Sequence, residues 1–308
     1  MERTVREEMD LEEEVRRLQE NGISTLRGWS LAAAGIRADV HDKNKDLLNT
    51  AFVELMNPAT TSAAEKLEGY YESVYNASWH HVVEVPGGEG TVMEVKEGEP
   101  EQSWTYKTVG RTLEKNDAVQ QSGEAPPRLM VLTSDRGWPY TWEQGVSEFI
   151  PDCYVNCEVE RVWRIVLGDL TKWFSSHGKK KISPRRRVLI GTPGIGKSMN
   201  AGSYLLYQLL HYDAEKLQMV AYCFGDEASL FDKTSKRVSR YEGGTSIMNI
   251  VKGFARRGVK GYIIYDVALK GRQPSNTLPC EGWGMIVVTP PDTKNSNRGR
   301  SWCKRNKS

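Results

Sequence analysis

The segment from Arg187 to Ser198 constrains the fold of this chain more than any other part of the sequence. It reads RVLIGTPGIGKS, and its last eight residues match the phosphate-binding loop pattern G-x-x-x-x-G-K-[ST]. A short apolar run precedes the glycines, and an amphipathic segment follows Ser198. This context predicts a strand, a loop and a helix in the order that a phosphate loop requires. The alternative is a glycine turn that only leads into a helix.

Each residue type in this loop has an expected role in binding phosphate. Glycines let consecutive backbone N–H groups turn toward phosphate oxygens, and the N-terminus of the following helix adds a partial positive charge. We expect Lys197 to reach the β- and γ-phosphates of a nucleotide, and the Ser198 hydroxyl to ligate Mg²⁺. The predicted nucleotide-binding residues are Gly191, Thr192, Pro193, Gly194, Ile195, Gly196, Lys197 and Ser198.

A second apolar run, GYIIYD at residues 261–266, ends in an aspartate downstream of the loop. We expect the strand to carry Asp266 to the nucleotide crevice, where its carboxylate would hold Mg²⁺ through water. Many ATP-hydrolysing proteins place a glutamate directly after this aspartate, whereas Val267 follows here. A base could come instead from Asp226 or Glu227, which follow a predicted strand at 217–224. The sequence therefore supports nucleotide binding better than hydrolysis, and whether the chain is an enzyme stays open.

A last apolar run at residues 284–289 ends in a hydroxyl side chain. In P-loop ATPases with an additional strand, the strand beside the phosphate loop often ends in a polar residue that senses the γ-phosphate. Thr289 is our candidate for this role, and Asp266 and Thr289 are the predicted catalytic residues. The alternative for Thr289 is a simple strand end before Pro290 and Pro291.

The region before the loop contains two kinds of sequence pattern, one typical of helices and one typical of strands. Helical spacing predicts helices at about 2–20, 44–56, 62–75, 156–176 and, beyond the loop, 245–257. Short β-branched or aromatic runs predict a small antiparallel sheet with strands at 79–85, 91–95, 104–109 and 129–133. Aromatic residues in this sheet could stack nucleobases, but the stretch is acidic and would repel phosphate, which favours ordinary packing.

Charge and cysteine content limit the partners. The net charge of +2 gives no whole-protein attraction to nucleic acid or membrane, and no apolar run approaches the roughly 18 residues of a membrane span. The five cysteines are scattered without a zinc-type spacing, so we expect a reducing compartment. The segment Lys179–Arg187 holds six cations and no carboxylate. It is typical of a nuclear-import patch, a direct nucleic-acid contact or a solvated linker.

Together these patterns predict an α/β P-loop NTPase core, three-layered with a mostly parallel sheet. A helical segment and a small α+β domain with antiparallel strands would precede it. The expected boundaries are 1–77 for the helical segment, 78–150 for the β-rich domain, 151–184 for a helix and basic linker, 185–291 for the core and 292–308 for a polar, basic tail.

Longer strings of the sequence resemble retrotransposon hot spot proteins, a large multigene family of trypanosomes. These strings lie at residues 67–82, 103–106, 152–176, 189–212, 262–267 and 283–289. The resemblance implies a nucleotide-binding P-loop core, a nuclear or perinuclear location, and association with chromatin, transcription or RNA export. Family members usually continue well past the position of Thr289, so we expect a C-terminally truncated member. A core of strand order 5-1-4-3-2 would then lack its fifth strand and leave the phosphate-loop strand at the edge.

Three functions are weighed on this basis. The first is a nuclear protein that binds ATP or GTP with Mg²⁺ and hydrolyses it weakly or not at all, with chromatin or RNA-processing proteins as partners. The second is a non-catalytic nuclear interaction module with a vestigial nucleotide site, or a non-functional truncated copy. The third is a small-molecule kinase, which Ser198-Met199 and the missing arginine-rich lid oppose.

Overall fold

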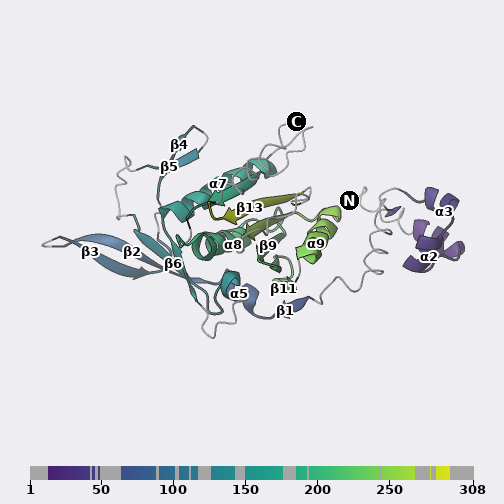
Figure 1. The fold of residues 1–308 in the computed structure, drawn as a ribbon, viewed down its shortest axis with the longest axis horizontal. Coiled ribbons are helices and arrows are strands. Elements are labelled where there is room, and N and C mark those ends of the chain that lie inside the picture. The colour runs from purple at the N-terminus through teal and green to yellow at the C-terminus, as the bar shows by residue number, and fades with distance from the viewer. Residues whose placement is uncertain are drawn as a thin grey trace. The chain divides into compact units, whose positions relative to one another are not determined.

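A computed structural model of the 308-residue chain describes residues 13–41, 44–45, 48, 64–87, 90–100, 104–110, 112–116, 126–142, 150–175, 185–192, 194–242, 244–267, 278 and 282–291. The chain divides into two compact units, Met1–Ser62 and Ala63–Ser308 (Figure 1).

The first unit is helical where it is described. Residues 13–20 form a helix, which confirms the described part of the helix expected at 2–20. Gly22 ends this helix in a left-handed conformation, with φ of 75°. Helices α2 (Leu26–Leu31) and α3 (Ala34–Ala38) follow, and the Thr25 side chain caps α2 by accepting from the Gly28 N–H. Of the helix expected at 44–56, the described residues 44, 45 and 48 are helical, and the rest lies outside the described residues.

A seven-stranded sheet organises the second unit. Its order is β1-β11-β10-β9-β12-β13-β8, with β1 at Glu65–Leu67, β8 at Arg186–Ile190, β9 at Met219–Phe224, β10 at Glu227–Asp232, β11 at Arg237–Glu242, β12 at Gly261–Asp266 and β13 at Trp283–Thr289. Three of its strand pairs are parallel and three are antiparallel. The sheet is therefore mixed, and the expectation of a mostly parallel sheet is wrong. The hairpin β10–β11, which the sequence analysis did not predict, adds the antiparallel part.

The parallel part of this sheet contains the strands that end at the glycine loop, at Asp266 and at Thr289. Its order β8-β13-β12-β9 agrees with the expected arrangement of the phosphate-loop strand and its three parallel neighbours. Strand β8 lies at the edge among the described strands, as expected. Since all four strands run the same way, their carboxyl ends meet at one edge of the sheet.

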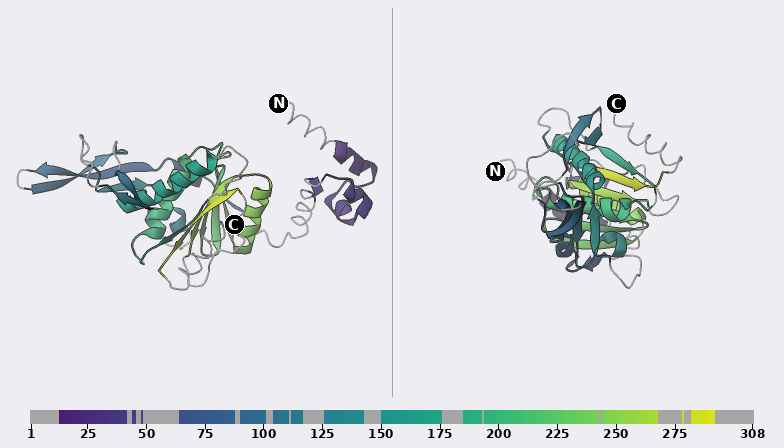
Figure 2. Two further views of the ribbon diagram at one scale, coloured as in Figure 1. Left: turned by 90° about the horizontal axis from the view of Figure 1, so that it is seen from above. Right: turned by 90° about the vertical axis from the view of Figure 1, so that its left-hand side faces the viewer.

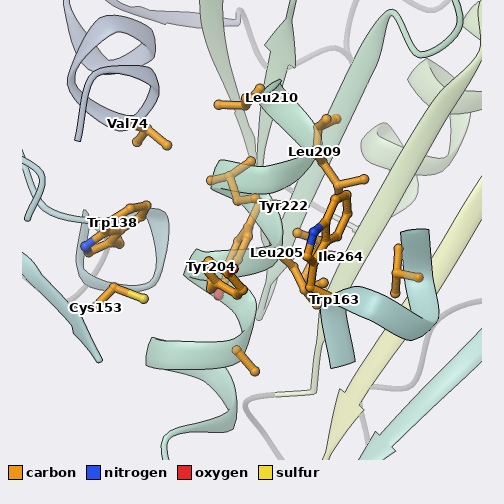
Figure 3. Packing of buried hydrophobic residues seen from close by; sticks show 14 of the residues in the cluster. Val74, Trp138, Cys153, Trp163, Tyr204, Leu205, Leu209, Leu210, Tyr222 and Ile264 are labelled. Carbon is orange, nitrogen blue, oxygen red and sulfur yellow. The ribbon is translucent and has the colours of Figure 1, made fainter. Parts of the chain in front are cut away.

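Helices cover both faces of the sheet. On one face, α7 (Cys157–Phe174) and α8 (Ser203–His211) pack against alternate residues such as Tyr222 and Ile264. Figure 3 shows Leu205 and Leu209 of α8 in this layer, and Trp163 of α7 and Ile264 of β12 belong to the same cluster. On the other face, α9 (Gly244–Arg256) packs against a second cluster that includes Ile263 and Met285. The three-layer arrangement expected from the sequence is therefore present.

A four-stranded antiparallel sheet of order β3-β2-β6-β7 lies along the chain between β1 and the other strands of the large sheet. Its strands are β2 (Ser78–Gly87), β3 (Gly90–Glu97), β6 (Leu129–Thr133) and β7 (Asp152–Val155), and the short helix α6 (Pro139–Trp142) lies between the last two. The expected run at 104–109 instead gives β4 (Tyr106–Val109), which pairs with β5 (Thr112–Lys115) in a separate two-stranded sheet. Strand β7 was not predicted.

The helix expected at 62–75 is wrong over its described first half. Residues 65–67 form β1, which pairs with β11, and only α5 (Tyr70–Tyr75) is helical. Gly69 separates them, because its φ of 79° is the left-handed conformation that interrupts a right-handed helix.

Candidate phosphate-binding site

The glycine loop leaves β8 at the carboxyl edge of the large sheet and enters a helix, as the sequence predicts. Gly194 and Gly196 have φ of 82° and 79°, a backbone conformation that side chains disfavour. Pro193 lies outside the described residues. The helix begins as a π-helical turn, η1 (Lys197–Gly202), before α8 continues it. A π-turn is rare and is frequently found at functional sites.

Two loop glycines lie close to side chains of the loop and of the helix that follows it. A β-carbon on Gly191 would lie 2.5 Å from Ile195 Cδ1 and 3.1 Å from Lys197 Cδ. A β-carbon on Gly196 would clash with the side-chain amide of Asn200. At Gly194, by contrast, nothing lies within 4 Å of such an atom. The loop therefore folds closely over its own side chains at both ends, with open space at its middle glycine.

Lys197 lies across this loop. Its Nζ donates a hydrogen bond of 2.6 Å to the Thr192 carbonyl oxygen at the opposite end of the loop. Burial lowers the pKa of Lys197, and the Asp266 carboxylate opposes that shift. The ammonium group is thus held at the loop and feels the charge of Asp266.

Asp266 ends β12 at the same edge and is buried, with 3% of its surface exposed. Its Oδ2 has no hydrogen-bond partner among the described residues. Burial raises the pKa of Asp266 to about 6, while a hydrogen bond from Ser198 and the charge of Lys197 act in the opposite direction. The structure thus brings Lys197, Ser198 and Asp266 together, although 68 residues separate Ser198 from Asp266 in the sequence.

Thr289 lies one strand away from this group. It pairs with Ile190, the last residue before the loop, and Asp266 pairs with Val288. Thr289 is buried, and its Oγ1 donates to the Pro290 carbonyl oxygen at 3.3 Å. The residue therefore ends the strand beside the loop, where a sensor of the γ-phosphate was expected.

The structure places the three positions considered for a catalytic base: Val267, Glu227 and Asp226. Val267 is buried among the apolar residues that face α9, together with Ile263. Glu227 begins β10 and forms an ion pair with Arg240 of β11, whose Nε donates to its carboxylate at 2.6 Å. Asp226 lies in the turn before β10 and is also engaged in an interaction. Val267 has no group that could activate water, and the Glu227 carboxylate is paired with Arg240.

Two residues near the loop carry contacts that the sequence analysis missed. Tyr222 of β9 donates from its hydroxyl to the Ser198 carbonyl oxygen at 3.3 Å, and it crowds Gly202. Asn200 of η1 accepts a hydrogen bond from the Tyr154 N–H of β7 at 3.2 Å. No signal in the sequence indicated a role for Tyr222, because the residue lies within an apolar strand pattern. Asn200 could have been noticed as a polar residue in an otherwise apolar helical face.

The end of the basic segment is used inside the fold. Arg187 of β8 donates to both carboxylate oxygens of Asp169 on α7, at 2.5 and 2.8 Å, and Arg185 lies 3.8 Å from the same carboxylate. Residues 179–184 lie outside the described residues. Over the described ranges, no three metal-ligating side chains gather, and no helix has the length and apolar character needed to span a bilayer.

The C-terminal part of the chain matches a P-loop domain. Residues 188–308 match the family model described as "Retrotransposon hot spot protein, P-loop domain", and residues 71–185 match "Retrotransposon hot spot proteins N-terminal". The chain belongs to the retrotransposon hot spot protein family, which confirms the resemblance seen in its sequence. No curated protein and no solved structure matches it.

Proposed function

We propose that this protein binds a nucleoside triphosphate with Mg²⁺ at the loop Gly191–Ser198. The observation that carries the proposal is the buried carboxylate of Asp266, which has one unpartnered oxygen beside Ser198 and Lys197. An unpaired buried polar atom is costly, and a bound cation is one way to satisfy it. The glycine backbone conformation and the helix that follows supply the N–H groups for phosphate.

The residues present fit a Mg²⁺ ion that is shared with phosphate. Mg²⁺ keeps several waters and usually takes only one or two protein ligands beside nucleotide oxygens. Ser198 and Asp266 would hold it here, and the ion would neutralise charge on the β- and γ-phosphates. Lys197 would exchange its bond to the Thr192 carbonyl oxygen for phosphate oxygens.

The proposal includes weak or absent hydrolysis. The position after Asp266 holds the buried, apolar Val267, and the Glu227 carboxylate is taken by Arg240. Neither residue can orient an attacking water. The titration described next shows whether the bound nucleotide is ATP or GTP.

The test is a thermal-shift and calorimetric titration of the full chain with Mg-ATP and Mg-GTP. Binding to the folded state raises its stability by about 2.7 kcal/mol at a ligand concentration of 100 times Kd. Lys197→Ala is expected to abolish saturable binding, whereas Lys172→Ala on the exposed face of α7 retains it. Equal binding by the wild type and Lys197→Ala would refute the proposal.

A second candidate function, a nuclear interaction module that ignores nucleotide, is favoured by β3. This strand lies at the edge of its sheet and exposes three apolar side chains, Val92 by 59%, Met93 by 58% and Val95 by 69%. Figure 2 shows the β2–β3 hairpin extending from the rest of its unit. Exposed apolar edge strands are sites of strand addition by a partner.

The family resemblance extends both candidates to the nucleus and to chromatin or RNA-processing partners. Imaging and chromatin fractionation of tagged protein would separate the two. A nucleotide-dependent protein loses its chromatin association in Lys197→Ala, whereas an interaction module keeps it there and loses it in Met93→Ser/Val95→Ser.

A further inference from the structure

Asn200 lies between the glycine loop and the upstream four-stranded sheet. On the loop side, its N–H donates to the Gly196 carbonyl oxygen at 2.7 Å, and its side-chain Nδ2 lies against the Gly196 backbone. On the sheet side, its Oδ1 accepts from the Tyr154 N–H at 3.2 Å. Since Oδ1 is used by Tyr154, the amide group has a fixed orientation, with its nitrogen toward the loop.

The partner of Asn200 is the outer edge of a sheet. Among the described strands, β7 pairs with β6 alone, so alternate N–H groups on its other side need a partner from elsewhere. The Asn200 side chain accepts from one of these groups, at Tyr154. A helix that begins at the glycine loop thus supplies a hydrogen-bond acceptor to the edge of the upstream sheet.

Cys153 adds a second tie at the same place. Its buried thiol donates to the Asn200 carbonyl oxygen, with the Sγ at 3.3 Å. Burial raises the pKa of this thiol well above its usual range, so the S–H donor is retained at neutral pH. Both bonds join the region that matches the N-terminal family model to the region that matches the P-loop model.

We propose that Asn200 is a positioning residue that couples the upstream sheet to the phosphate loop, so that nucleotide binding and the edge of β7 respond to each other. This inference rests on the proposed nucleotide function. In this arrangement the side-chain amide of Asn200 occupies the space that a β-carbon at position 196 would need, so the two residues constrain each other. A nucleotide that orders the loop also fixes Asn200 and thereby protects the Tyr154 N–H, and the reverse coupling has the same size.

The coupling makes the N-terminal family region part of the nucleotide site without any contact to the ligand. It also gives a reason for a polar residue at position 200, inside a helix whose neighbours Ala201 and Gly202 are buried. An alanine there would be a better helix former, so the asparagine is not explained by helix propensity.

The experiment compares three full-length proteins: the wild type, Asn200→Ala and the control Asn249→Ala, which changes an exposed asparagine on α9. Calorimetry measures the Kd for the Mg-nucleotide, and hydrogen–deuterium exchange follows the Tyr154 amide with and without Mg-nucleotide. We expect Asn200→Ala to bind about five- to tenfold more weakly, as the loss of one neutral hydrogen bond implies. Its melting temperature is expected to stay close to that of the control.

The exchange data separate positioning from general stability. In the wild type and Asn249→Ala, exchange at Tyr154 is expected to slow when nucleotide is added. In Asn200→Ala it is expected to be fast and insensitive to nucleotide. If the wild type binds no nucleotide, the proposed function fails. If the wild type binds, but Asn200→Ala binds equally well or the exchange at Tyr154 ignores nucleotide, the positioning role of Asn200 is refuted while nucleotide binding stands.

Discussion

Arg187 Nε and Nη2 donate to the two carboxylate oxygens of Asp169, at 2.5 and 2.8 Å, and so join β8 to α7. The Asp169 side chain is 7% exposed, and that of Arg187 is 31% exposed. The pair lies at the start of the strand that leads into the glycine loop. It fixes the edge strand of the sheet from the helix above it.

We predict that Arg187→Met destabilises the protein by about 2 to 4 kcal/mol, because it removes two hydrogen bonds from the buried Asp169 carboxylate. Urea unfolding followed by circular dichroism measures the change. Arg161→Met, which breaks the more exposed pair with Glu158, is the control and is expected to cost less than about 1 kcal/mol. Adding Asp169→Leu to Arg187→Met is expected to restore part of the loss, and a further loss would contradict this account.

The buried Asp266 predicts a pH dependence of stability. Burial raises its pKa from 3.8 to about 6 in the folded protein, so folding favours the protonated carboxyl. The stabilisation is complete below about pH 4 and is lost as the pH rises through 6, since a buried carboxylate then forms. The wild type is expected to lose up to about 3 kcal/mol relative to Asp266→Asn between pH 4 and pH 7. Urea unfolding of both proteins across this range measures the difference in their free energies of unfolding. A difference that does not change with pH would contradict the prediction.

The two left-handed glycines of the loop predict different costs for the same substitution. Gly194→Ala adds only backbone strain, of about 1 kcal/mol, because its surroundings are open. Gly196→Ala adds the same strain and also displaces the Asn200 amide, so a cost of about 2 to 3 kcal/mol is expected. Chemical unfolding without nucleotide tests the order of the two. Equal costs would show that the contact with Asn200 contributes nothing.

Lys233 provides a prediction at alkaline pH. Its side chain is buried, and its Nζ donates to the carbonyl oxygens of Leu209 and Tyr212 at the end of α8. Burial lowers its pKa from 10.5 to about 8, so the unfolded chain binds the proton more tightly. The free energy of unfolding of the wild type should therefore rise relative to Lys233→Met between about pH 8 and 10.5. Parallel curves for the two proteins over this range would contradict the prediction.

The sequence was most informative where chemistry and periodicity coincide. The strand at 261–266 and the helix around 157–174 appear at or near their expected bounds, since long apolar patterns and turn residues mark both. The edge position of the phosphate-loop strand also agrees with the expected order. Ser198 and Asp266 come together because parallel strands end at a common edge, a consequence of topology that the two motifs already imply.

The rest depended on tertiary contacts that short segments do not encode. Strand β7 has only four residues, and it forms because β6 and Asn200 supply partners for its backbone. The hairpin β10–β11 is largely polar, and its turn relies on Asp232 accepting from the N–H groups of Thr234 and Ser235. The role of Tyr222 was invisible for the same reason, since its hydroxyl finds Ser198 only in the folded chain.

The wide turn at Lys197–Gly202 fixes how the chain can change in length here. The Ala201 N–H bonds to the Gly196 carbonyl oxygen at 3.1 Å, one residue further along than in an ordinary helix. Deleting one residue between 198 and 202 would remove the extra residue of this turn, so that Leu205 and Leu209 keep their direction relative to the glycines. Inserting a residue would instead rotate both leucines by about 100° and take them out of the core, so this short stretch should tolerate a deletion far better than an insertion.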